Sequence, residues 1–275
     1  MEDCNYILVN GSFVLANDYR ITIRESEGFL FAEKFRAVRT SLQFFKETLD
    51  SITFKLQIYN QSYPELTENN GAGLKRQLER TLTKNKQFMG AVLMIRFWIS
   101  EQNMKYSIQC SKTENIGYEL NNKGLYISIF RDIKKSVSTL SDSSIGSDIY
   151  WKITANCRKD SFIDEFLLIN TDDSIIESIG SNVYLIKNGI VRGASVQQGA
   201  YADITKPLIL NIFESQKIGY NENEAITEQD LNDAEEIFLV NAIDGIRWVV
   251  GYEGKRYFNN TIRRINESFI RNLLS

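Results

Sequence analysis

Two tight turns in the second half of the chain restrict its fold more than any other feature of the sequence. Asn188-Gly189 and the segment 251–254 each lie between runs of strand-forming residues. Glycine-containing turns of this length join antiparallel strands, so this half must contain β-hairpins. Hairpins exclude a simple parallel sheet, and the sequence lacks a glycine-rich phosphate loop of the Walker or dinucleotide type. A Rossmann fold is therefore not expected.

The first half is also predicted to begin with a hairpin, because two short apolar runs flank Asn10-Gly11. Further along, apolar side chains recur at helical spacing in two segments, and two other segments are rich in β-branched and aromatic residues. The predicted helices cover residues 35–52 and a segment marked by Leu74, Leu78 and Leu82, and the predicted strands cover residues 91–99 and 106–111.

The best candidate for a linker is the polar segment 114–124, where hydrophobic periodicity lapses and turn-forming residues cluster. It would separate a small α/β domain of residues 1–113 from a larger α+β domain of residues 125–275. Strands in the larger domain are predicted at 125–130, 165–170, 182–186, 236–241 and 247–252, with one helix beginning at Ile204 and a final helix ending at Ser275. The expected class is α+β without internal repeats.

Composition and charge exclude several classes of function. The 275-residue chain has a net charge of -3 with acids and bases interspersed, which is not the basic field that nucleic acid requires. Its longest apolar runs have the length of strands, so no membrane span is expected. The acidic N-terminus does not resemble a signal peptide, which favours a cytoplasmic location.

Cysteine and histidine usage restricts the chemistry further. Cys4, Cys110 and Cys157 are widely spaced and odd in number, which favours free thiols over a disulfide framework. The complete absence of histidine removes Ser-His-Asp and Cys-His machinery and histidine zinc sites, and no metal site is predicted. Lysine, carboxylate or cofactor chemistry must therefore serve any enzymatic activity.

Three segments of the second half occur in a particular order. Lys152 is followed by Asn156, Glu177 is followed by Asn182 in the next strand, and an acidic, then apolar strand covers 235–241. Together they resemble the signature of the fold-type IV pyridoxal-phosphate proteins, the class IV aminotransferases. This family includes branched-chain aminotransferases and 4-amino-4-deoxychorismate lyases. The resemblance extends to the N-terminal hairpin and Asn85, and it implies a two-domain, D-amino-acid aminotransferase-like α+β architecture.

The resemblance also implies a role for each matching residue. Lys152 would bind pyridoxal 5'-phosphate covalently, a task that requires an amine whose pKa is lowered by burial. Glu177 would lie against the pyridinium nitrogen and keep it protonated. The cofactor phosphate would be bound by backbone amides at two places, which the resemblance maps to Ile204-Thr205 and to Ala242-Ile243.

The sequence departs from the family pattern around the phosphate. Asp203 stands where a glycine is usual, and as a helix N-cap its carboxylate would compete for amides that a phosphate needs. Two like charges about 4 Å apart repel by ~1–4 kcal/mol at a partly exposed site. Thr48 and Ser51 stand where a His-x-x-Arg pair is usual. The cations left as alternatives for the missing arginine are Arg36, Arg39, Lys159 and Lys206.

Two hypotheses of different class therefore remain open. The first is a pyridoxal-phosphate-dependent transaminase or lyase that acts on a small amino-bearing molecule. The second is a noncatalytic homologue with a degraded cofactor site, acting as a binding or regulatory protein. The resemblance implies a homodimer for either.

Overall fold

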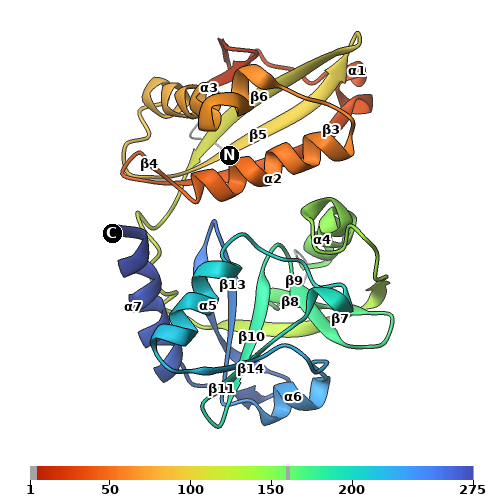
Figure 1. Ribbon diagram of the computed structural model, residues 1–275, viewed down its shortest axis with the longest axis vertical. Coiled ribbons are helices and arrows are strands. Elements are labelled where there is room, and N and C mark those ends of the chain that lie inside the picture. The colour runs from red at the N-terminus through yellow and green to blue at the C-terminus, as the bar shows by residue number, and fades with distance from the viewer. Residues whose placement is uncertain (1–4, 159–161, 275) are drawn as a thin grey trace. The chain divides into compact units, whose positions relative to one another are not determined.

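The Asn10-Gly11 turn joins β1 (Tyr6–Val9) to β2 (Ser12–Leu15), and both turn residues have positive φ, 47° and 85°. The structure is a computed structural model that describes residues 5–158 and 162–274. Contacts divide the chain into two units, residues 1–117 and residues 118–275, and the division falls inside the segment 114–124. Each unit is built on its own β-sheet (Figure 1).

The first unit is an antiparallel sheet in the order β2-β1-β6-β5-β3-β4, against which helices pack. The Asn85 side chain accepts from the Tyr6 amide at 2.8 Å and donates to the Tyr6 carbonyl at 3.0 Å, which ties the hairpin to the end of α3. The remaining elements are α1 (Ile23–Glu27), β3 (Phe29–Val38), β4 (Ser41–Gln43), α2 (Phe45–Ile58), α3 (Pro64–Lys84), β5 (Gly90–Ser100) and β6 (Asn103–Lys112).

The helix predicted over residues 35–52 is wrong in its first part. Residues 35–38 belong to β3, and only from Phe45 onward is the segment helical. Arg39, Thr40 and Phe44 have positive φ, which no right-handed helix can contain, and they form the turns between β3, β4 and α2. Apolar side chains on a strand and on the following helix happened to fall at helical spacing.

The second unit contains a larger mixed sheet in the order β12-β11-β10-β13-β14-β7-β8-β9. Although β9 is last in that order, the chain passes directly from β9 to β10 through paired amides and carbonyls of Ser178 and Ser181, so the sheet curls back on itself. The strands are β7 (Leu125–Lys135), β8 (Glu165–Asn170), β9 (Ile175–Ser178), β10 (Asn182–Lys187), β11 (Ile190–Gly193), β12 (Gly219–Asn221), β13 (Glu236–Asn241), β14 (Gly245–Tyr252) and β15 (Lys255–Arg256).

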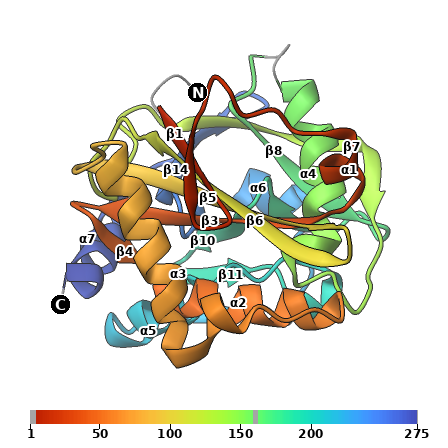
Figure 2. The same ribbon diagram turned by 90° about the horizontal axis from the view of Figure 1, so that it is seen from above.

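Among the described residues of this unit, four α-helices and a short 3-10 helix (Val196–Gln198) accompany the sheet, and α4 and α7 lie on opposite sides of the unit (Figures 1 and 2). The four α-helices are α4 (Ser144–Arg158), α5 (Lys206–Ser215), α6 (Glu228–Asp233) and α7 (Asn260–Leu274). The five predicted strands of this unit are confirmed, the helix predicted from Ile204 begins at Lys206, and the final helix extends to Leu274. Ser275, its predicted end, is outside the described residues.

Helix α4 was not predicted, because its two faces are unusual. It exposes Ile149 and Ile153 and buries Ser147 and Thr154. A helix that hides small polar side chains and presents isoleucines lacks the apolar stripe that reveals most surface helices.

Membrane spans, metal sites and thiols can be assessed for the described residues only. Among them, no helix is both long and apolar enough to cross a membrane. The same part of the chain contains no group of three or more Cys, Asp or Glu arranged to bind a metal ion. Cys110 is a buried thiol that lies 4.0 Å from the Thr81 carbonyl and Cys157 is an exposed one, whereas Cys4 lies outside the described ranges.

Candidate active site

A buried lysine stands at the end of β7. The ammonium group of Lys135 donates to the Ser141 carbonyl at 2.8 Å, to Ser147 Oγ at 2.7 Å and to Glu177 Oε2 at 2.8 Å. Its side chain is 1% exposed and that of Glu177 is 0% exposed. An ammonium group has three donors, and all three are satisfied inside the protein.

Glu177 is bound from three directions. Besides Lys135, its Oε1 accepts from the Trp151 indole at 2.9 Å and its Oε2 accepts from the Tyr201 amide at 2.6 Å. Glu177 lies on β9 opposite Leu168 of β8, and Trp151 comes from α4. The rings of Trp151 and Tyr201 meet edge to face with centroids 4.9 Å apart. One carboxylate therefore joins a strand, a helix and a loop.

The environment of Lys135 affects its proton affinity in two opposed ways. Burial lowers the pKa of this amine, and the nearby carboxylate of Glu177 raises it, with burial the larger effect. The net pKa of Lys135 is below its usual value. An amine with a lowered pKa is more often neutral, and hence more nucleophilic, near pH 7.

Lys152, the lysine predicted to bind the cofactor, lies elsewhere. It is on α4 with its side chain 60% exposed, and its ammonium group pairs with Asp148 at 2.5 Å, one helical turn away. Asn156, the other residue of that motif, is also exposed on α4. The structure does not bring Lys152 to Glu177, and it places Lys135 there instead.

A second buried carboxylate, Asp203, lies just before α5. Its Oδ1 accepts from the Thr205 amide at 2.9 Å and from the Thr205 hydroxyl at 2.6 Å. The Ala242 amide lowers the pKa of this carboxyl, and the Tyr201 hydroxyl lies 3.4 Å from its Oδ2. Asp203 thus accepts the amide of Thr205 and is influenced by the amide of Ala242, one residue from each of the two segments that the resemblance assigned to phosphate binding, Ile204-Thr205 and Ala242-Ile243.

The turn after β13 is held by its own asparagine. Asn241 Oδ1 accepts from the amides of Ile243 at 2.8 Å and Asp244 at 2.7 Å. Its Nδ2 donates to Ser181 Oγ at 2.8 Å. The Ile243 amide is therefore engaged within the turn, while the neighbouring Ala242 amide faces Asp203.

Asn182, the first residue of β10, holds the segment that contains Asp203. Its Nδ2 donates to the Tyr201 carbonyl and its Oδ1 accepts from the Asp203 amide at 3.1 Å. Because Tyr201 also donates its amide to Glu177, this short segment links the Lys135–Glu177 pair to the Asp203 carboxylate.

The small-domain positions where the family pattern has its His-x-x-Arg pair are engaged locally. Thr48 donates to the Phe44 carbonyl, and Ser51 donates to Glu33.

The cations left as replacements for the missing phosphate arginine are placed as follows. Arg36 donates to main-chain carbonyls at Asn115 and Gly117, and Lys206 pairs with Glu222 at 2.6 Å. Arg39 is exposed, and Lys159 lies outside the described residues.

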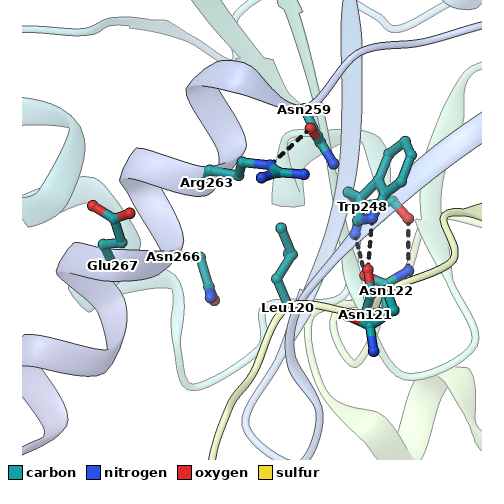
Figure 3. A pocket seen from close by; sticks show the side chains of 8 residues that line it. All are labelled: Leu120, Asn121, Asn122, Trp248, Asn259, Arg263, Asn266 and Glu267. Carbon is teal, nitrogen blue, oxygen red and sulfur yellow. Dashed lines mark hydrogen bonds between the residues drawn. The ribbon is translucent and has the colours of Figure 1, made fainter.

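A pocket of about 280 Å³ opens beside α7 (Figure 3). Its lining is mostly polar and includes Asn121, Arg263 and Asn266. Trp248 closes one side, held by hydrogen bonds from its amide and indole to Asn121. None of its lining residues belongs to the cluster around Lys135 or Asp203.

The family model for class IV amino-transferases matches residues 65–252, more than half of the chain. The chain belongs to the class IV aminotransferase family. The cluster of Lys135, Glu177, Asp203 and Ala242 lies entirely within the matched range.

Two solved structures of aminotransferases have the same fold over nearly the whole length of this chain. The branched-chain aminotransferase of Thermoproteus uzoniensis, solved with norvaline, superposes with a TM-score of 0.81 over 98% of this chain and 94% of that one, at 17% identity. An aminotransferase of Brucella abortus, solved with its cofactor PLP, superposes with a TM-score of 0.81 over 98% and 99%, at 11% identity. At such identities the likeness concerns the fold, and it confirms the two-domain α+β architecture predicted from the sequence.

Curated relatives of this family member match only part of the chain. An Aquifex aeolicus protein named for branched-chain-amino-acid aminotransferase activity is 25% identical over 167 residues, 56% of this chain. The chain spans about half or less of the length of the curated relatives that it matches, 53% in this case and 36% in another.

Sequence reasoning singled out Glu177 as a site candidate and did not single out Lys135. Ile127 and Ile129 of β7 belong to one hydrophobic cluster and Phe130 to another. A register irregularity between Phe130 and Lys135 interrupts the alternation of faces along β7, so the preceding residues of the strand do not indicate where the Lys135 side chain points. Trp151 and Tyr201 likewise carried no signal, since their contacts depend on how α4 and the loop before α5 pack.

Proposed function

We propose that this family member is a pyridoxal-phosphate-dependent aminotransferase or lyase that acts on a small amino-bearing molecule, with Lys135 as its reactive lysine. The observation that carries the proposal is the pair of Lys135 and Glu177, both fully buried and 2.8 Å apart. Burying two ionised groups is costly and contributes little net stability, so such a pair is a candidate for function.

Lys135 is suited to attack a carbonyl group. Burial lowers its pKa, and Ser147 Oγ and the Ser141 carbonyl orient its nitrogen. A neutral amine in that position can act as a nucleophile and can later accept and return a proton at Nζ. Ser147 is placed to hold Nζ in both charge states, because a hydroxyl can donate as well as accept.

Glu177 is suited to hold a proton on a heterocyclic nitrogen. Its two oxygens are fixed by the Trp151 indole and the Tyr201 amide. A carboxylate held in this way favours a cation beside it, which in the present structure is the ammonium group of Lys135. When bound, pyridoxal phosphate supplies a protonated pyridine ring that withdraws electrons from the carbon next to the substrate's amine.

The residues fit one end of this cofactor and not the other. At the ring end, a buried amine and a buried carboxylate are present with two aromatic side chains. At the phosphate end, the Asp203 carboxylate already accepts the amide of Thr205, and the Ala242 amide lowers its pKa. Binding would require Lys135 to leave Glu177 and Asp203 to leave its amides.

A homodimer and a cytoplasmic location complete the proposal. The family resemblance supports the dimer, as does the exposure of Ile149 and Ile153 one turn apart on α4. Sedimentation of the purified chain tests it, and a monomer would contradict it.

Covalent trapping tests the assignment of the lysine. The protein is incubated with saturating pyridoxal phosphate and separately with unphosphorylated pyridoxal, reduced with borohydride and mapped by peptide mass. We expect the pyridoxyl mark on Lys135, its loss in Lys135→Ala, and its retention in the matched control Lys152→Ala. A mark on Lys152, or none with either aldehyde, would contradict the assignment. Absence of any mark would favour the noncatalytic homologue.

A further inference from the structure

We propose that the Asp203 carboxylate is a built-in occupant of the anion cup formed by the amides of Thr205 and Ala242, so that this cup admits a phosphate only when Asp203 is neutral or replaced. The inference deepens the proposed function, and it rests on that function only for the identity of the molecule that carries the phosphate.

The geometry of Asp203 is that of a bound anion. Its Oδ1 accepts from the Thr205 amide and hydroxyl at 2.9 and 2.6 Å, and the Ala242 amide, in the turn after β13, lowers the pKa of the same carboxyl. Backbone amides at the start of a helix are the usual ligands of phosphate groups. Here the chain supplies the anion itself, from two residues before the amide at Thr205.

Phosphate and carboxylate cannot share these donors. Each amide has a single hydrogen, so a phosphate at hydrogen-bond distance from Thr205 and Ala242 would occupy the place of the carboxylate. If Asp203 merely moved aside while charged, it would remain a buried anion beside the phosphate. Like charges in contact at a buried site repel strongly.

The groups that face Asp203 do not relieve this repulsion. On its own segment lie the Thr205 hydroxyl and the Tyr201 hydroxyl, and from β10 the ring of Tyr184, whose pKa Asp203 raises. These phenols are neutral near pH 7, because burial raises the pKa of both further still. Lys206, the nearest cation in sequence, is engaged with Glu222.

Protonation of the Asp203 carboxylate would remove its negative charge. Burial raises the pKa of Asp203 to about 6, against the opposing effect of its hydrogen bonds. Below that pH the side chain becomes neutral and its hold on the amides weakens. The chain contains no histidine, so few other groups change charge between pH 5 and 7.

Anion binding tests the cup without any covalent chemistry. Sulfate is a suitable probe, because its charge is constant over this pH range. Its binding is measured by calorimetry at pH 5.0 to 7.5 for wild type, Asp203→Asn, Asp203→Gly and the control Asp172→Asn, which alters an exposed turn. We expect wild type and the control to bind sulfate about tenfold or more tightly at pH 5 than at pH 7.5. Asp203→Asn should show no such pH dependence, and Asp203→Gly should bind tightly throughout.

Binding of pyridoxal phosphate and of unphosphorylated pyridoxal provides a second test. At pH 7.5 we expect Asp203→Gly to bind pyridoxal phosphate at least about tenfold more tightly than wild type, with pyridoxal binding changed little. Equal affinity of wild type and both Asp203 variants for sulfate and pyridoxal phosphate would overturn the inference, provided that circular dichroism shows native folding. If Asp203→Gly gains sulfate binding but no aldehyde marks Lys135, the inference stands and the proposed function fails.

Discussion

Trp151 and Lys152 are adjacent on α4, yet only one of them reaches the buried carboxylate: Trp151 donates its indole hydrogen to Glu177 at 2.9 Å, while Lys152 pairs with Asp148 in solvent. Neighbours on an α-helix point about 100° apart around its axis. The distance along the chain from Lys152 to Glu177 therefore could not show which residue of this helix faces the site.

Removal of the buried ammonium should be strongly destabilising. Lys135→Met leaves the charge of Glu177 buried and unpaired, so we expect the free energy of unfolding to fall by about 3–5 kcal/mol. The matched control Lys152→Met, at an exposed position, should change it by less than about 0.5 kcal/mol. Urea denaturation measures both.

The double variant Lys135→Met/Glu177→Gln extends this test. It removes both charges, so we expect much of the loss to be recovered relative to Lys135→Met alone. The single variant Glu177→Gln completes the comparison. If the loss of unfolding free energy in the double variant equals the sum of the losses in the two single variants, Lys135 and Glu177 do not interact as the structure indicates.

The hydrogen bond from the Trp151 indole to Glu177 should stabilise the folded state. Trp151→Phe keeps an aromatic ring and removes the donor to Glu177 Oε1, so we expect a loss of about 1–3 kcal/mol in unfolding free energy. In a Glu177→Gln background the loss should be smaller, since the acceptor no longer carries a charge. An equal loss in both backgrounds would assign the effect to ring packing alone.

Asp203 should give the protein a characteristic pH dependence of stability. Burial raises the pKa of Asp203 to about 6 in the folded state from its ordinary value of 3.8, which applies to the unfolded chain. Between these two pH values the folded state therefore binds more protons than the unfolded state. Stability therefore decreases as pH rises from about 4 to 6, by up to about 3 kcal/mol from this group. Asp203→Asn should lack this contribution, so the wild-type minus variant difference in unfolding free energy is the quantity to measure. Parallel curves would contradict the raised pKa.

Asn182 should control the order of the segment before α5. Asn182→Ala removes the donor to the Tyr201 carbonyl and the acceptor for the Asp203 amide, and we expect a loss of about 1–3 kcal/mol. Hydrogen exchange at the Asp203 amide should accelerate in the variant more than at amides of β13. Unchanged exchange at Asp203 would show that other contacts hold the segment.

The fold was more predictable from sequence than the site. Hairpin turns and apolar strands depend on local residue patterns, and so five strands of the nine-stranded sheet of the second unit were predicted. Two of the elements that were not predicted are β3, whose apolar residues mimic helical spacing, and α4, which buries Ser147 and Thr154. Without α4, Lys152 could not be recognised as a surface residue of a helix. Glu177 and Asp203 could be singled out from sequence because each lies in a short segment that resembles the family pattern, and the structure shows both side chains buried.

The ion pair of Lys135 and Glu177 also bears on how the second unit assembles. Lys135 is paired with Asn170 of β8, and Glu177 with Leu168 of the same strand, so the pair reaches across β8 from β7 to β9. A slip of either strand by one residue would turn one of the two side chains to the opposite face of the sheet. Both charges would then be buried apart, at a cost of several kcal/mol. The two residues thus select one alignment of three strands before any ligand arrives.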